Sequence, residues 1–131
     1  MIFLLLALAT ADPGCMVSAS AERACVAGDE LDRYERQLRA VYRSAWSNAA
    51  AADKRERLRG VVIVSKDRTN VFALESAQAA WVKLTDSECL FAAIETRPGT
   101  DEALSEITCH AARVRQRIAF LTFLARRLER R

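Results

Sequence analysis

Four cysteines are the residues of this chain whose type and spacing could do chemistry. Cys15 and Cys25 lie close together near the N-terminus, while Cys89 and Cys109 stand almost symmetrically around the turn sequence Arg97-Pro98-Gly99-Thr100. If that turn joins two antiparallel helices, Cys89 and Cys109 face each other. Cysteine pairs at such spacings are typical of disulfide frameworks, which persist in oxidising compartments. We therefore predict the bridges Cys15–Cys25 and Cys89–Cys109.

Zinc binding and thiol catalysis are the alternative roles for these cysteines. The chain has no C-x-x-C pair and no spaced histidine pair, which are the patterns that structural zinc sites use. Its single histidine, His110, directly follows Cys109, and adjacent side chains on a helix project about 100° apart. That geometry disfavours a shared zinc ion and a Cys–His catalytic pair alike. We predict bridging cysteines and a surface position for His110.

Carboxylates on helices are the remaining candidates for catalysis. Glu102 and Glu106 lie one helical turn apart, and Asp86 and Glu88 lie close together before the turn. A glycosidase needs two carboxyl groups, but these stand among charged neighbours, as solvated helix faces do. The sequence also lacks a phosphate-binding glycine loop, a nucleophile elbow and a metalloprotease motif. Binding is thus favoured over catalysis by elimination, and no catalytic residue, metal ligand or cofactor is expected.

Composition points to one helical domain. Of the 131 residues, 51% are hydrophobic, only two are proline and only four are glycine, which favours helices over a sheet. The net charge of +3 is nearly balanced, although the segment from Arg113 to Arg131 is locally basic. Aromatic residues are not interleaved with these arginines as in nucleic-acid-binding proteins. We expect no nucleic-acid partner.

Residues 1–11 have the pattern of a signal peptide. The apolar run Ile2–Ala9 leads into Ala9-Thr10-Ala11, which matches an h-region and an A-x-A cleavage site, although no Lys or Arg precedes the run. The run is too short to span a bilayer, and no other segment qualifies as a transmembrane segment. We expect cleavage near Ala11 and a mature domain of residues 12–131 that is periplasmic or secreted.

Apolar residues at helical spacing predict three long helices and one short N-terminal helix. The expected ranges are about 15–28 with Ser18 or Ser20 as N-cap, 29–59 ending near Gly60, 69–96, and a last helix after the N-cap Thr100. Gly28-Asp29 is expected to separate the first two. The β-branched run Val61–Val64 has no partner strand, so we expect helix or irregular structure there.

The last two long helices are expected to form an antiparallel hairpin. Facing positions in such a hairpin have residue numbers with a nearly constant sum, and the pair Cys89–Cys109 has the same sum as three apolar pairs. These pairs are Ile94–Leu104, Phe91–Ile107 and Leu84–Val114, and Trp81–Ile118 differs by one. The predicted fold is therefore all-α: a small disulfide-stapled domain with a long antiparallel helical hairpin.

Three short motifs accompany the cysteine pairs in a fixed order. The first is a Leu-Arg-Ala-Val-Tyr element, the second is a Gln-Ala-Ala-Trp element that leads to an Asp and a Cys, and the third follows the last cysteine. Their residues are Leu38 and Tyr42; Gln78, Trp81, Asp86 and Cys89; and Cys109, Arg117 and Leu121. Together they resemble the N-terminal domain family of the LprI-type lysozyme inhibitors, small exported bacterial domains of which many have four cysteines. The chain departs from that pattern at Arg39, where the family has Asn, and at Leu84 and Thr85, where it has an aromatic residue and Arg.

The resemblance covers roughly Cys15 to Leu128 and implies an exported protein that binds a lysozyme and blocks it. Many lysozymes are basic, so a chain at +3 lacks long-range attraction and would dock through local acidic groups, such as those within 29–35 and 101–106. Two other interpretations stay open. One is a periplasmic interaction or envelope-stress module with a non-lysozyme partner, and the other is an enzyme that acts on cell-wall glycan through Glu102 and Glu106.

Overall fold

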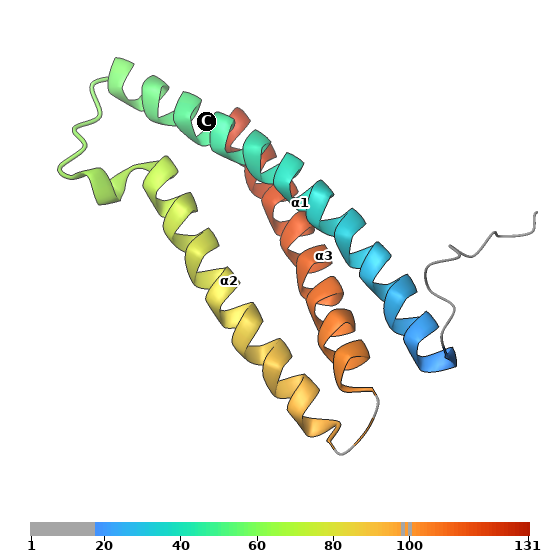
Figure 1. Cartoon of the computed structure of the whole chain (residues 1–131). Helices are drawn as coiled ribbons and strands as arrows, with labels where there is room; N and C mark the ends of the chain where they lie inside the picture. The colour runs from blue at the N-terminus through green and yellow to red at the C-terminus, as the bar shows by residue number, and fades with distance from the viewer. Residues whose placement is uncertain (1–17, 98, 100) are drawn as a thin grey trace, which may run out of the picture.

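The computed structural model describes residues 18–97, 99 and 101–131, which form three long helices. These are α1 (Ala19–Leu58), α2 (Asn70–Glu95) and α3 (Glu102–Glu129), with a short 3-10 helix η2 (Lys66–Arg68) before α2. α1 and α3 pack side by side in the same direction, and α2 runs antiparallel to both, with α3 seen between α1 and α2 in this view (Figure 1). The described ranges contain no strand, which confirms the all-α prediction. None of these helices combines the length and apolarity needed to cross a membrane.

Helix α1 is continuous where the sequence predicted a break. It begins at the N-cap Ser18, whose side chain accepts a hydrogen bond from the backbone N–H of Ala21, and it passes through Gly28 without interruption. A glycine inside a helix costs only about 0.5–1 kcal/mol relative to alanine, which packing against α3 over the length of α1 offsets. The predicted break at Gly28, and with it a separate short helix that ends there, was therefore wrong. The predicted start of that helix at Cys15 lies outside the described residues.

Gly60 ends α1 as predicted. Its φ of +78° is left-handed, which favours glycine, and the following turn is a Schellman motif. The N–H of Gly60 donates to the carbonyl of Arg57, and the N–H of Val61 donates to the carbonyl of Glu56. Residues 61–64 are irregular, so the absence of a strand in the valine-rich run is confirmed.

The start of α2 is fixed by Thr69 and by a carboxylate from α1. The side chain of Thr69 accepts from the N–H of Phe72 at 3.2 Å. Asp53, only 4% exposed, accepts from the N–H groups of Asn70 and Val71 at 2.8 and 3.1 Å, and from the Asn70 amide at 2.7 Å. These N–H groups would otherwise lack partners at a helix N-terminus, so Asp53 both caps α2 and ties it to α1.

The core lies mainly between α1 and α3 and is rich in alanine. Small residues of α1 allow a close approach to the larger residues of α3, and α2 adds fewer core residues. The buried apolar core consists of Leu38, Ala45, Ala49, Ala52, Leu74, Val114, Ile118, Leu121, Ala125 and Leu128. Polar side chains of α1 also bind the end of α3: Asn48 donates to the carbonyl of Ala125, and Arg55 donates to that of Leu128.

The hairpin register is confirmed at the cysteines, but the rotation of α2 differs from the prediction. Cys89 and Cys109 form a disulfide with a Cα–Cα distance of 5.4 Å. Leu84, Phe91 and Ile94, which were expected in the seam, are 58%, 61% and 41% exposed. The residues of α2 that are buried toward its end are Thr85, Cys89 and Ala93. Because α2 is apolar around most of its circumference, helical periodicity did not determine which face packs inward.

The other predicted bridge stays a prediction. Cys25 lies on α1 and is disulfide-bonded. Cys15 lies outside the described residues, so the structure does not test the pairing Cys15–Cys25.

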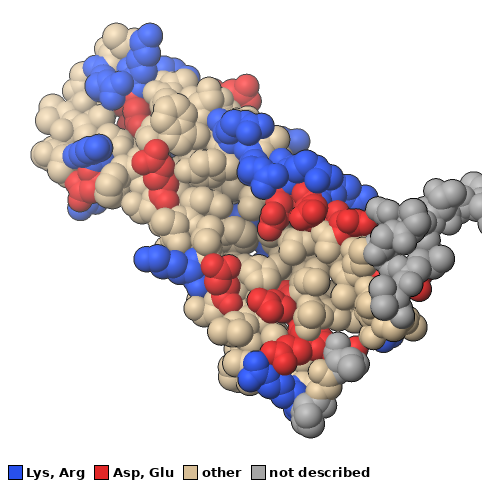
Figure 2. All heavy atoms as spheres, viewed as in Figure 1, with Lys and Arg blue, Asp and Glu red and all other residues tan. Residues whose placement is uncertain are grey.

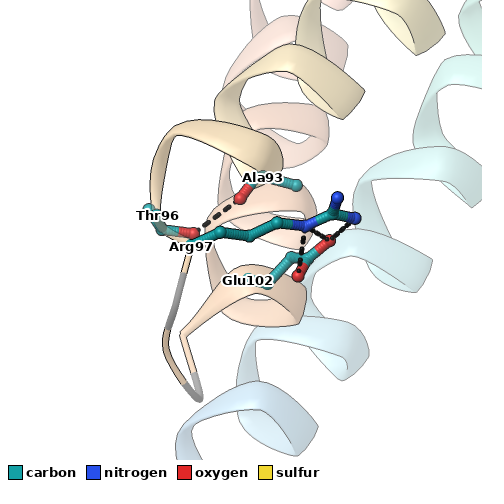
Figure 3. Close-up of polar contacts among 4 residues, drawn as sticks. All are labelled: Ala93, Thr96, Arg97 and Glu102. Carbon is teal, nitrogen blue, oxygen red and sulfur yellow. Dashed lines mark hydrogen bonds and ion pairs between the residues drawn. The ribbon is translucent and has the colours of Figure 1, made fainter.

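The connection from α2 to α3 is held by an ion pair across the turn (Figure 3). Arg97 Nε donates to both carboxylate oxygens of Glu102 at 2.9 Å, and Arg97 Nη2 donates to Oε1 at 2.6 Å. At the end of α2, Thr96 donates its hydroxyl to the carbonyl of Ala93 at 2.7 Å. The predicted N-cap, Thr100, lies outside the described residues. α3 begins at Glu102 after Asp101, whose side chain makes no capping hydrogen bond.

Glu102 is expected to make a small part of the stability dependent on pH. Its hydrogen bonds to Arg97 lower the pKa of the carboxyl group from its usual value of 4.5. A carboxyl group with a depressed pKa stabilises the folded state above its unfolded pKa and loses that contribution as the pH falls through the folded pKa. We expect Glu102→Gln to lower the melting temperature slightly at pH 7, and the difference from the parent protein to vanish below the folded pKa of Glu102. Thermal unfolding of both proteins from pH 7 to pH 2 checks this, and a difference that persists at pH 2 would contradict it.

Candidate functional site

A pocket lies where all three long helices meet. Its volume is about 190 Å³. α1 and α2 form its walls, and two residues of α3 complete it. The lining residues are Glu35, Leu38 and Arg39 of α1; Gln78, Trp81, Val82, Thr85 and Asp86 of α2; and His110 and Val114 of α3. The half-buried His110 thus lines this pocket and does not simply stand on the surface as predicted.

Most of the motif residues found in the sequence converge on this pocket. Leu38, Gln78, Trp81 and Asp86 line it, although they come from two helices and lie up to 48 positions apart. The other three motif residues besides the cysteines, Tyr42, Arg117 and Leu121, do not line the pocket. Tyr42 packs against the core at its edge, and Leu121 is fully buried inside it.

Arg117 supports the pocket from behind. Its Nε donates to Gln78 Oε1 at 3.0 Å, and its guanidinium lies over the rings of Trp81 at 5.5 Å and Phe120 at 5.0 Å. Burial lowers the pKa of Arg117, and the nearby Tyr42 acts weakly in the opposite direction. Arginine stays protonated in proteins, so these contacts hold a cation against the aromatic rings. Arg117 therefore fixes the positions of Gln78 and Trp81 in the pocket wall.

A second polar contact between α1 and α2, outside the pocket lining, was not predicted from the sequence. Trp46 Nε1 donates to Glu75 Oε1 at 2.9 Å. Burial and the charge of Glu75 raise the pKa of Tyr42, one turn before Trp46, while Arg117 lowers it. The signal available in the sequence was two aromatic residues four positions apart on a face rich in alanine. Their partner on α2 could not be identified without the tertiary structure.

Two carboxylates and one guanidinium line the pocket, and Arg117 lies behind its wall. Glu35 and Asp86 stand on opposite walls, and Arg39 is the one cationic residue among those that line the pocket. Arg39 forms a loose ion pair with Glu35 at 3.9 Å, whereas Asp86 forms no ion pair or hydrogen bond within the described ranges. Figure 2 shows acidic side chains gathered between the N-terminal half of α1 and the C-terminal half of α2, beside a basic band along α1.

One member of each carboxylate pair considered for catalysis is held by an arginine. Glu102 is bound by Arg97, and its lowered pKa is the opposite of what a general acid needs. Glu88 forms an ion pair with Arg113 at 2.6 Å. Among the described residues, no group of three or more His, Cys, Asp or Glu side chains could hold a metal ion.

Comparison with known protein families gives one match. Residues 15–121 match the sequence model of a family described as Lysozyme inhibitor LprI. The chain belongs to the LprI lysozyme inhibitor family. No curated protein and no solved structure matches the chain. The family resemblance inferred from the motifs is thereby confirmed.

Two of the three departures of this LprI-family chain from the motif pattern lie at the same pocket. Arg39 on α1 and Thr85 on α2 both line the pocket. Leu84, the third departure, is 58% exposed and points away from the core. The motif residues thus divide into a structural set, with Leu121 and the Cys89–Cys109 bridge, and a set that shapes one pocket.

Proposed function

We propose that this protein is an exported lysozyme inhibitor that acts by binding the enzyme. The observation that carries the proposal is the family match over residues 15–121. Export is supported by the Cys89–Cys109 disulfide, because such bonds persist in oxidising compartments, and by the apolar run at residues 2–9. We further propose that cleavage near Ala11 releases residues 12–131 into the periplasm or the medium.

The dimensions of the site support binding to a protein over binding to a glycan. Pockets for small ligands have volumes of about 300–1,000 Å³, and the three-helix pocket is smaller, at about 190 Å³. It can receive one side chain of a partner. Acidic groups beside it favour a partner that is locally basic, even though the net charge of the whole chain is +3.

An assay of cell-wall lysis tests this proposal. Purified, oxidised protein in excess is expected to slow the lysis of bacterial cell walls by at least one type of lysozyme. The control is the same protein after reduction and alkylation, which is expected to inhibit less because the hairpin loses its bridge. Unchanged lysis rates across several lysozyme types would contradict the proposal.

The alternative is a periplasmic interaction or envelope-stress module with a non-lysozyme partner. The exposed apolar side chains of α2 favour it, since contiguous exposed apolar surface marks interaction sites. These side chains are Leu84, Leu90, Phe91 and Ile94. A periplasmic pull-down that recovers only lysozyme would argue against this alternative.

A further inference from the structure

We propose that the three-helix pocket binds an arginine side chain of the lysozyme. The inference rests on the proposed function and adds to it the place and the chemistry of contact. It follows from the size of the pocket, an unpartnered hydroxyl on a buried threonine, two carboxylates and an aromatic ring.

Thr85 is the residue that points most directly to an occupant. It is 3% exposed, lines the pocket, and its hydroxyl makes no hydrogen bond within the described part of the chain. Thr108 and Thr122, which are also helical, each donate to the carbonyl four residues earlier. Thr85 Oγ1 is not among the fully buried side-chain atoms that lack a partner, so the hydroxyl keeps some exposure at the pocket and is available to a group that enters it.

The charged groups select a cation with several donors. Glu35 offers a carboxylate from α1, and Asp86 offers one from α2. Thr85, the neighbour of Asp86, adds a hydroxyl oxygen as a third acceptor. A guanidinium carries five N–H donors in a planar fork and pairs well with carboxylates. Asp86 has no competing partner, and the ion pair of Glu35 with Arg39 is long at 3.9 Å between half-exposed side chains. An incoming guanidinium can therefore compete for both carboxylates.

The aromatic wall fits the same ligand. Trp81 lines the pocket, and tryptophan is the side chain whose ring attracts cations most strongly. Arg117 already occupies one position over this ring at 5.5 Å. The volume of about 190 Å³ is room for one long side chain.

Calorimetric titration of a basic lysozyme tests the pocket directly. The variants are Glu35→Gln with Asp86→Asn, and Thr85→Val, each in the full chain with its disulfides intact. The control is Asp67→Asn with Glu129→Gln, which removes the same charge far from the pocket. We expect the double pocket variant to bind roughly tenfold or more weakly, Thr85→Val to bind several-fold more weakly, and the control to match the parent protein. Unchanged melting temperatures show that the pocket variants are folded.

The outcomes separate this inference from the proposed function. If the parent protein inhibits lysozyme and the double pocket variant binds equally well, the pocket inference is wrong and the proposed function stands. If no lysozyme binds, the proposed function is wrong, and titration with N-acetyl-arginine amide decides the pocket. A shift of the Trp81 indole NMR signal that the double variant abolishes supports the pocket, and the absence of a shift overturns it.

Discussion

Replacing Asp53 with alanine is expected to lower the free energy of unfolding by about 3–4 kcal/mol, because it removes three charge-assisted hydrogen bonds at a buried helix start. The carboxylate accepts from the N–H groups of Asn70 and Val71 and from the Asn70 side chain. At 4% exposure, water can replace these contacts only in part. The loss also removes a negative charge from the positive end of the α2 dipole.

Chemical denaturation of Asp53→Ala and two comparison variants measures this effect. Asp53→Asn keeps one acceptor oxygen and is expected to lose about half as much stability. Asp86→Ala is the control, because it removes an exposed aspartate of α2 that has no hydrogen bond in the described ranges. A loss below about 1 kcal/mol for Asp53→Ala, no more than an ordinary hydrogen bond contributes, would show that the cap is replaced by solvent.

Removal of the hairpin disulfide, by Cys89→Ala with Cys109→Ala, is expected to cost about 3–4 kcal/mol. The bridge closes a loop of 20 residues, for which the chain-entropy estimate is about 3 kcal/mol. Cys89 is also fully buried, so its loss leaves a small cavity that adds to the cost. α2 depends on this bridge more than the other helices do, since it packs less extensively than α1 and α3 pack together.

Denaturant unfolding separates the two contributions to the disulfide effect. The entropic contribution acts on the unfolded chain, so the double variant should show a steeper dependence of the unfolding free energy on denaturant. Thr96→Ala is a control near the same hairpin end, where only one hydrogen bond is lost. Equal stability of the double variant and the parent protein would contradict the prediction.

Several local features were predictable from sequence because their causes are local. Thr69 before Asn70 marks the start of α2, and Gly60 marks the end of α1, since capping depends on residues within one turn. The inward positions of Val114 and Ile118 on α3 were also predicted correctly, because the polar and apolar faces of this helix are clearly separated. Gly28 misled the prediction because a single glycine costs too little to end a long packed helix.

The sequence identified some residues of the candidate site but not their arrangement. The motif residues Gln78, Trp81 and Asp86 were identified from sequence, but nothing local indicated that Thr85 and Arg39 line the same pocket. Their meeting depends on the rotation of α2, which an almost uniformly apolar helix leaves undetermined. Arg117 had been recognised as a motif residue, yet its role behind Trp81 required the position of α3.

By itself, the sequence determined the helices, the Cys89–Cys109 bridge and the family, because these depend on short-range pattern and on motif order. The tertiary structure alone decided which face of α2 is buried, that Asp53 caps α2, and that one pocket gathers residues from three helices. The physical reason is that the close packing of alanines in α1 against α3 sets the space left for α2. That space, and not the periodicity of α2, places Thr85 inward and Leu84 outward.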